Sequence, residues 1–154
     1  MLPDVCYAFF SKDVHLLNMQ NGLADNTVSA VYKDKEGFVW FGTRNGLSRY
    51  DGRQITNFEQ SNSYPSISNL KEVFDGVLAF VDNGVFSAFD LKKERFLSVV
   101  SSSGQGIPSR GMLQRNDSLV WVISGSELHL MKRCASKEGE LRLRVQEKYT
   151  GWNN

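Results

Sequence analysis

Residues 37–52 read GFVWFGTRNGLSRYDG and place two hairpin signals, Asn45-Gly46 and Asp51-Gly52, in one short stretch. Asn-Gly is the strongest short hairpin signal, because a type I′ turn needs positive φ at both central residues. Runs rich in β-branched and aromatic residues surround both signals, at 26–33, 38–44, 47–50 and 54–58. The stretch therefore predicts the two middle strands of a four-stranded antiparallel meander.

The same pattern returns twice along the chain. Trp121 in SLVWVI follows Trp40 by 81 residues, and Asn83-Gly84 follows Asn45-Gly46 by 38. A spacing of about 40 residues is typical of one four-stranded propeller blade. The sequence predicts an all-β fold, a partial β-propeller with about three four-stranded antiparallel blades at 26–60, 67–100 and 107–148.

The segments outside these copies indicate an open ring. Residues 5–17, VCYAFFSKDVHLL, look like one strand from the blade that closes the ring, and residues 139–148 look like the outer strand of the third blade. Propellers typically have four to eight blades. Three blades and one extra strand do not close a ring, so we expect the chain to be a fragment of one β-propeller domain.

The first copy resembles a known repeat. Residues 22–52 contain Gly22-Leu23, Asn26-Thr27-Val28, Trp40-Phe41-Gly42-Thr43, Asn45-Gly46-Leu47 and Tyr50-Asp51-Gly52 in order. This pattern closely resembles the two-component regulator propeller repeat. The second and third copies depart from it, with Leu78 or Ala79 at the Trp position and Glu127 where the turn glycine belongs.

The resemblance implies a periplasmic sensor piece of a hybrid two-component protein from a polysaccharide-degrading bacterium. Such a parent is an inner-membrane protein that carries its histidine kinase, receiver and DNA-binding domains elsewhere and controls transcription. The implied partners are the remaining blades of the parent chain, an oligosaccharide ligand and a second parent copy in a homodimer. The sequence of this chain shows no kinase, receiver or DNA-binding motif.

Composition limits the other classes of function. The chain has 154 residues and a formal net charge of +1, which gives no electrostatic reason to expect direct binding to nucleic acid. Its longest apolar runs are five residues, too short for a membrane-spanning helix. The two cysteines, Cys6 and Cys134, allow one disulfide, although two separate thiols are favoured.

Candidate binding residues lie in the connections that should share one mouth of the propeller, because loops on a rigid scaffold commonly carry function. They are Asn26, Arg44, Asn45, Asn69, Asp82, Asn83 and Arg110. Asn and Asp serve turns well, so turn formation explains most of these positions, whereas Arg44 and Arg110 have no role in a turn. A structural role is expected for Trp40, Phe41, Gly42, Gly46, Gly52 and Trp121, with the aromatic residues packed between blades.

The sequence does not support catalysis. It contains His15 and His129, but no His and Cys cluster at metal-ligand spacing and no Gly-x-Ser-x-Gly motif, so we expect neither a metal nor another cofactor. A propeller enzyme of the streptogramin-lyase type is an alternative and would need a histidine at the mouth. His129 is expected in the third strand of its blade, away from the axis. A propeller that serves only as a scaffold or for dimerisation is a further alternative.

Overall fold

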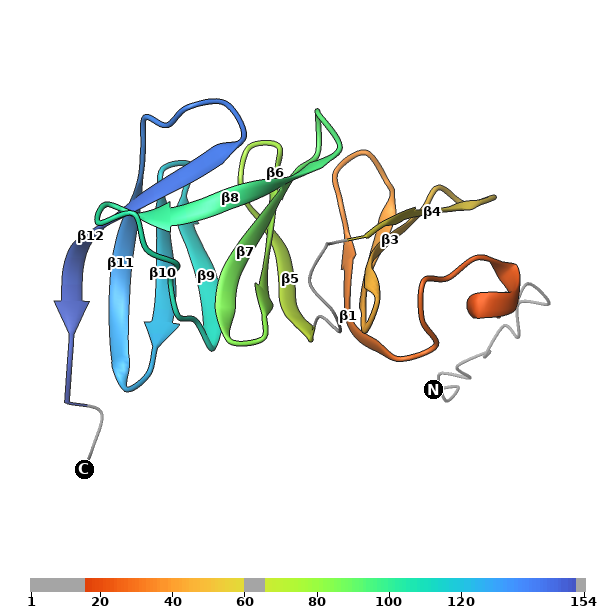
Figure 1. The fold of residues 1–154 in the computed structure, drawn as a ribbon, viewed down its shortest axis with the longest axis horizontal. Coiled ribbons are helices and arrows are strands. Elements are labelled where there is room, and N and C mark those ends of the chain that lie inside the picture. The colour runs from red at the N-terminus through yellow and green to blue at the C-terminus, as the bar shows by residue number, and fades with distance from the viewer. Residues whose placement is uncertain (1–15, 60–65, 152–154) are drawn as a thin grey trace, which may run out of the picture.

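The computed structural model describes residues 16–59 and 66–151, which form an almost entirely β structure (Figure 1). The helical structure in these ranges is a single 3-10 turn, η1 (Met19–Asn21), capped by the side chain of Asn18. The strand expected at 5–17 lies mostly outside the described residues, and Leu16 and Leu17 belong to no strand. The predicted all-β, partial-propeller fold is confirmed.

The first sheet is the meander predicted from residues 37–52, and we call it blade 1. Its strands run in the order β1-β2-β3-β4 and are β1 (Val28–Lys33), β2 (Val39–Thr43), β3 (Gly46–Tyr50) and β4 (Ile55–Phe58). Trp40 in β2 lies opposite Tyr32 of β1 and Arg49 of β3. β1 lies next to β5, the first strand of the following blade, as expected for an innermost strand.

The remaining strands form one eight-stranded sheet in the order β5-β6-β7-β8-β12-β11-β10-β9. Blade 2 consists of β5 (Ile67–Phe74), β6 (Val77–Asp82), β7 (Val85–Asp90) and β8 (Arg95–Ser101). Blade 3 consists of β9 (Gly111–Asn116), β10 (Leu119–Ser124), β11 (Glu127–Cys134) and β12 (Glu140–Tyr149). Within each blade every neighbouring pair of strands is antiparallel.

The outer strands of blades 2 and 3 join the two blades, which the sequence did not predict. β8 pairs with β7 only from Arg95 to Leu97, and its residues 98–101 then pair in parallel with 140–143 of β12. Figure 1 shows β8 crossing from blade 2 to meet β12. Fourth strands of successive blades run in the same direction, so they can pair only in parallel. The pairing occupies backbone groups that two outer edges would otherwise leave open.

Two apolar cores lie between the blades, because alternate residues of each middle strand point to opposite neighbours. The core between blades 1 and 2 includes Trp40, Leu47, Ile67, Leu70, Leu78, Phe80 and Phe89. The core between blades 2 and 3 includes Val73, Phe74, Phe86, Val120, Val122, Met131, Leu141 and Leu143. Blade 2 is therefore covered by another blade on both faces. On the other face of blade 1, residues 22–24 lie against β3 and β4, where Ala24 N donates to Ser48 Oγ and Asn57 Nδ2 donates to Gly22 O.

The two tryptophans of the repeat have different surroundings. Trp40 is 1% exposed and its ring lies 5.5 Å from those of both Phe58 and Phe89. Trp121 is half-buried on the face of blade 3 that points away from blade 2, where its ring lies 5.6 Å from that of Tyr149. The two residues hold the same position in their blades, but only Trp40 has a following blade to pack against.

Gly42 follows Trp40 by two residues and allows a close approach between blades. A Cβ at this position would lie 2.5 Å from Cγ2 of Ile67 in β5 and 3.3 Å from Cβ of Ala30 in β1. The absence of a side chain at Gly42 therefore lets Ile67 fill the space between the two sheets.

Candidate functional site

The hairpins between the second and third strands of the three blades lie along one edge of the fold, at the lower edge in Figure 1. The β6–β7 hairpin is hydrogen-bonded to the segment before β5 and to the segment before β9. Asn83 N donates to Ser66 O at 3.4 Å, and Ser109 N donates to Gly84 O at 2.7 Å. Arg110 N donates to Ile123 O at 2.8 Å, next to the β10–β11 hairpin. The connections that lead into β5 and β9 therefore lie at the same edge as the hairpins between the second and third strands of each blade.

The three hairpins at this edge have different turns. At Asn83-Gly84 both central residues have positive φ, 47° and 79°, as a type I′ turn requires. In blade 1 the strands close one residue earlier than expected, with Thr43 opposite Gly46, so Arg44 and Asn45 form the loop. Arg44 is therefore a turn residue, and the expectation that it has no role in a turn was wrong. Only Gly46 has positive φ there, at 105°, so the type I′ turn expected at Asn45-Gly46 was wrong.

The third hairpin places its glycine earlier than the first. Its strands close with Ser124 opposite Glu127, and the loop is Gly125-Ser126 with φ of 61° at Gly125. Positive φ at the first loop residue alone is typical of a type II′ turn. Glu127 lies opposite Ser124 as Gly46 lies opposite Thr43, so it stands at the position of the first turn glycine, as the alignment of the repeats predicted. It needs no glycine conformation, because Gly125 supplies the positive φ of this turn.

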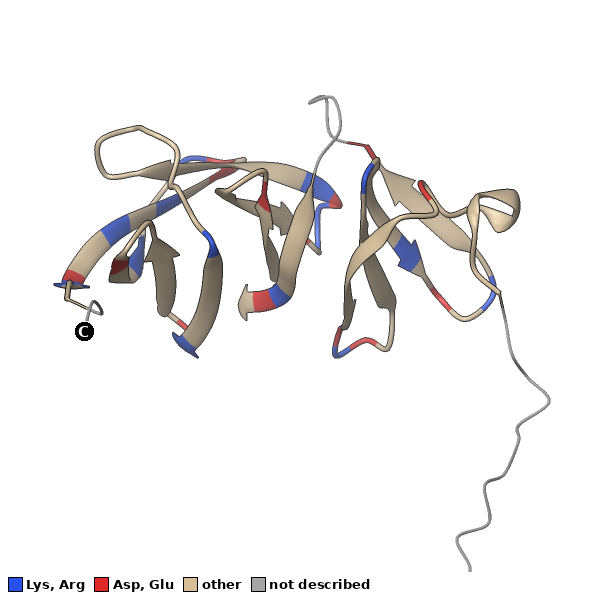
Figure 2. Ribbon diagram, turned by 90° about the horizontal axis from the view of Figure 1, so that it is seen from below, with Lys and Arg blue, Asp and Glu red and all other residues tan. Residues whose placement is uncertain are grey.

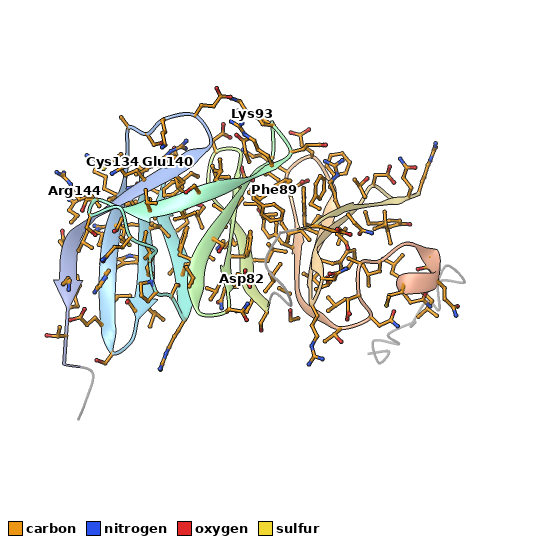
Figure 3. The ribbon with its side chains drawn as sticks, in the orientation of Figure 1. Asp82, Phe89, Lys93, Cys134, Glu140 and Arg144 are labelled. Atoms are coloured by element: carbon orange, nitrogen blue, oxygen red, sulfur yellow. The ribbon has the colours of Figure 1, made fainter. Side chains whose placement is uncertain are left out.

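Several predicted binding residues have partners within the fold. The carboxylate of Asp82 is buried and accepts a hydrogen bond from Ser66 N at 3.1 Å. Figure 3 labels Asp82 at this edge of blade 2. Asn45 N donates to Thr43 Oγ1 at 3.1 Å, and Asn26 Oδ1 accepts from Met19 N at 2.8 Å. Asn26 is thereby tied to η1 rather than to the residues of the other blades.

Asn69 and Arg110 are brought together between blades 2 and 3. Asn69 has φ of 53° in a bulge of β5, and its Nδ2 donates to the backbone oxygen of Arg110 at 3.4 Å. The same Nδ2 lies 3.4 Å from Ser68 Oγ. These strands are the innermost of their blades, so Asn69 and Arg110 are the predicted site residues nearest to the axis of the ring.

Two guanidinium groups of the predicted site are available for a ligand. The exposed side chains of Arg44 and Arg110 form no hydrogen bond or ion pair with any residue in 16–59 or 66–151. Arginine donors suit planar or oxygen-rich anionic groups, since the guanidinium stays charged and presents several N–H groups. Such donors can form hydrogen bonds to polar or anionic groups.

The opposite edge of the fold holds a hollow that was not expected from the sequence. A cavity of about 230 Å³ lies between blades 1 and 2 and is lined in part by Asp34, Phe38, Trp40, Arg49 and Lys92. Asp34 accepts a hydrogen bond from Trp40 Nε1 at 2.7 Å and another from Phe38 N at 2.9 Å. Arg49 lies over the Phe38 ring, 4.8 Å from its centroid, and pairs with Glu94 at 2.6 Å. Asp34 and Arg49 thus have partners within the protein, and we interpret the hollow as part of the contact between blades 1 and 2.

Ion pairs between blades occupy the same edge. Lys35 Nζ lies 2.6 Å from Asp75 Oδ1, and Lys93 Nζ lies 2.8 Å from Glu138 Oε1. The hydrogen bond from Lys35 lowers the pKa of Asp75, and that from Lys93 lowers the pKa of Glu138. Figure 2 shows acidic and basic residues interspersed along the ribbon of the blades.

His129 lies in β11, the third strand of blade 3, as expected from its position in the repeat. Its side chain is largely buried, and Nε2 lies 2.6 Å from Glu127 Oε2, which also pairs with Lys148 at 3.2 Å. The hydrogen bond from His129 lowers the pKa of Glu127. His129 is thus bonded to Glu127 and lies away from the inner strands, which disfavours the lyase alternative.

Metal, thiol and membrane features add little to the site. Within 16–59 and 66–151 no group of three or more His, Cys, Asp or Glu side chains could hold a metal ion. Cys134 is a free, half-buried thiol, and Cys6 lies outside the described residues. In the part of the chain that the structure describes, no helix is long and apolar enough to cross a membrane.

Comparison with known proteins agrees with the repeat recognised in the sequence. The family described as "Two component regulator propeller" matches this chain at residues 22–45. A search of the curated proteins gave no match.

Two solved structures from B. thetaiotaomicron are similar to this chain. The extracellular domain of BT3049, described as a hybrid two component system, is 20% identical with a TM-score of 0.58, over 77% of this chain and 18% of that one. The extracellular domain of BT4673, described in one structure as a one component system, is 18% identical with a TM-score of 0.62, over 86% of this chain and 21% of that one.

The chain spans about a fifth of the length of these solved domains. At such identities the likeness establishes the fold alone. The family match and the sheet topology together confirm that residues 22–45 are a two component regulator propeller repeat within a partial β-propeller.

Proposed function

We propose that this chain is part of the extracytoplasmic, ligand-binding propeller of a hybrid two-component signalling protein. The observation that carries the proposal is the repeat at residues 22–45, which matches a family named for two component regulators. The similar solved structures are extracellular domains of proteins described as two component or one component systems, which supports a sensor role outside the cytoplasm.

In this proposal the chain supplies blades at 26–60, 67–100 and 107–148, and residues 5–17 supply a strand of the ring-closing blade. Neighbouring blades come from the same parent chain. The parent is a periplasmic sensor of an inner-membrane protein, forms a homodimer and carries histidine kinase activity outside this chain. Detection of a carbohydrate by the propeller controls transcription of genes for polysaccharide use. The chain itself catalyses no reaction and holds no cofactor.

The binding residues that we propose are those at the mouth: Asn26, Arg44, Asn45, Asn69, Asp82, Asn83 and Arg110. Arg44 and Arg110 are the principal contacts, because both are exposed and neither side chain is held by another described residue. The hydroxyl groups of an oligosaccharide, and the carboxylate of an acidic one, match guanidinium and amide donors. Asp82 and Asn45 contribute chiefly by shaping the hairpins.

Titration of the isotope-labelled chain with neutral and uronate-containing oligosaccharides, followed by NMR, tests this site. We expect chemical-shift changes at the amides of Arg44, Asn69 and Arg110, and we expect Arg44→Ala and Arg110→Ala each to weaken binding at least several-fold. Arg53→Ala is the matched control, because Arg53 is an exposed arginine in the turn between β3 and β4 at the opposite edge.

Shifts confined to the opposite edge, or equal losses in all three arginine variants, would contradict the proposed site. The absence of binding to any oligosaccharide would favour the scaffold alternative. Release of a product during the titration would favour the enzyme alternative.

A further inference from the structure

A second hollow lies between blades 2 and 3, at the edge opposite the proposed mouth. It has a volume of about 420 Å³ and is lined by the β5–β6 and β7–β8 turns of blade 2 and by the β11–β12 loop of blade 3. Figure 3 labels Lys93 and Glu140, which line it, on the side of the fold away from Asp82. Pockets for small organic molecules commonly have volumes of about 300–1,000 Å³, so this one has room for such a molecule. We call it the blade 2–3 hollow.

The blade 2–3 hollow has more basic side chains than carboxylates left to neutralise them. Of its four carboxylates, Asp75 lies 2.6 Å from Lys35 and Glu140 lies 2.9 Å from Arg142, and both of these cations lie outside the hollow. Each carboxylate is farther from the lysine that it faces inside the hollow, at 3.2 Å and 3.9 Å respectively. The basic residues that line the hollow are Lys92, Lys93, Arg95, Arg133 and Lys137. The hollow therefore suits a negatively charged ligand.

Arg95 of blade 2 has a donor that is buried and unpaired. Its guanidinium reaches the β11–β12 loop of blade 3, where Nη2 lies 3.0 Å from Glu138 Oε1, and Lys93 Nζ lies 2.8 Å from the same oxygen. Nε of Arg95 is buried, and no residue in 16–59 or 66–151 accepts a hydrogen bond from it. Buried donors nearly always have an acceptor, and one without a protein partner points to a bound water or ion. An oxyanion in the hollow would supply that acceptor.

Arg133 supplies a second guanidinium, from β11 of blade 3. Its Cζ lies 5.6 Å from the centroid of the buried Phe74 ring, a contact that holds the guanidinium without using its N–H groups. Its side chain forms no hydrogen bond or ion pair with the rest of residues 16–59 and 66–151. Arginine donors match the planar carboxylate, whose two oxygens can accept hydrogen bonds in parallel.

We propose that the blade 2–3 hollow binds a small organic anion through its carboxylate group. Arg95 and Arg133 bind the carboxylate, and Lys93 and Lys137 add positive charge around it. A bare carboxylate would fill little of 420 Å³, since one water takes about 30 Å³ in the liquid, so the body of an organic molecule occupies the rest. The ligand would contact both blades. This site is separate from the proposed mouth and does not depend on the proposed function.

Glu138 competes with the ligand in this proposal, because its carboxylate already accepts hydrogen bonds from Lys93 and Arg95. Its side chain is 71% exposed, so it can turn away into solvent when another carboxylate binds. Glu138→Gln removes the competing charge and should tighten binding several-fold. A variant that merely damaged the fold would weaken binding instead, so this gain separates a binding role from a structural one.

NMR titration of the isotope-labelled chain tests the proposal with three probes at constant ionic strength: sodium glucuronate, glucose as the matched neutral sugar, and sodium acetate as a carboxylate without a body. We expect saturable shifts at the amides of Arg95, Arg133 and Lys137 with glucuronate, none with glucose, and weaker binding of acetate. Arg133→Gln and Arg95→Gln should each weaken glucuronate binding at least about tenfold, as expected for loss of a hydrogen bond between charged groups. Arg144→Gln is the matched control, because Arg144 is an exposed arginine of β12 outside the hollow, and its variant should bind as the unmodified chain does.

The dispersion of the amide spectrum shows whether each variant is folded, and Arg133→Gln remains decisive if Arg95→Gln fails to fold. The proposal would be overturned by equal binding of glucose and glucuronate, by equal binding of acetate and glucuronate, or by unchanged affinity in Arg133→Gln. It would also be overturned if neither the unmodified chain nor Glu138→Gln showed shifts at the hollow. Shifts confined to Arg44, Asn69 and Arg110 would place the anion at the mouth, so the two proposed sites fail independently.

Discussion

Replacement of Trp40 tests the packing of blade 1 against blade 2 most directly. Trp40 is 1% exposed, its ring contacts those of Phe58 and Phe89, and its Nε1 donates to Asp34 at 2.7 Å. Trp40→Ala removes the buried ring and leaves a cavity, which costs about 3–5 kcal/mol. It also leaves the largely buried Asp34 carboxylate without one donor, which adds about 1–3 kcal/mol. We expect a total loss of about 4–6 kcal/mol in the free energy of unfolding, less than the simple sum because the site relaxes.

Urea unfolding followed by circular dichroism measures this loss. A small domain is stable by about 5–15 kcal/mol, so if Trp40→Ala leaves too little folded protein to measure, Trp40→Phe provides the second value. Trp40→Phe keeps an aromatic ring and loses the N–H donor, so it should cost about 1–3 kcal/mol. A loss below about 1 kcal/mol for Trp40→Ala would refute the packing of these two sheets against each other.

Two further substitutions test the contacts between blades. Gly42→Ala should destabilise the chain by about 1–3 kcal/mol through overpacking against Cγ2 of Ile67. Ile67→Ala removes that Cγ2, so the penalty of Gly42→Ala should be smaller in the Ile67→Ala background. Gly106→Ala, whose new Cβ would make only an ordinary contact with Val85, should change stability by less than about 0.5 kcal/mol. Lys35 lowers the pKa of Asp75 below its ordinary value of 3.8, so this pair stabilises the fold above that pH and loses its contribution as the pH falls through the lowered pKa. Asp75→Asn should flatten the acid limb of a plot of urea midpoint against pH, and an unchanged limb would show that the pair does not contribute.

The meander of blade 1 could be predicted because its signals are local. Asn45-Gly46, Asp51-Gly52 and the aromatic run around Trp40 each act within a few residues, and the strands form where these signals place them. The repeat spacing extended the same argument to blades 2 and 3, although Ala79 replaces the tryptophan in blade 2. The exact turns were less predictable, because a shift of one residue in strand register moved the first loop to Arg44-Asn45.

The candidate site was only partly accessible to sequence reasoning. In an antiparallel meander, the connection into the first strand and the hairpin between the second and third strands lie at the same edge. Asn69 and Arg110 could therefore be placed together from the sequence. The attachment of Asn26 to η1 could not be foreseen, because it depends on the hydrogen bond to Met19 N. The bond between Asp34 and Trp40 was missed for the same reason, since an acidic residue before a turn gives no sign that its carboxylate faces a buried indole.

The sequence by itself determined the all-β class, the four-stranded unit and the recognition of the repeat, because hairpins and alternation are encoded over short distances. Only the tertiary structure decided which faces are covered and that β8 leaves β7 to pair with β12. Trp40 and Trp121 show the difference, since the same residue at the same repeat position is fully buried in one blade and half-buried in another. The physical reason is that burial of a sheet face depends on the neighbouring sheet, which is distant in sequence and absent from any local pattern.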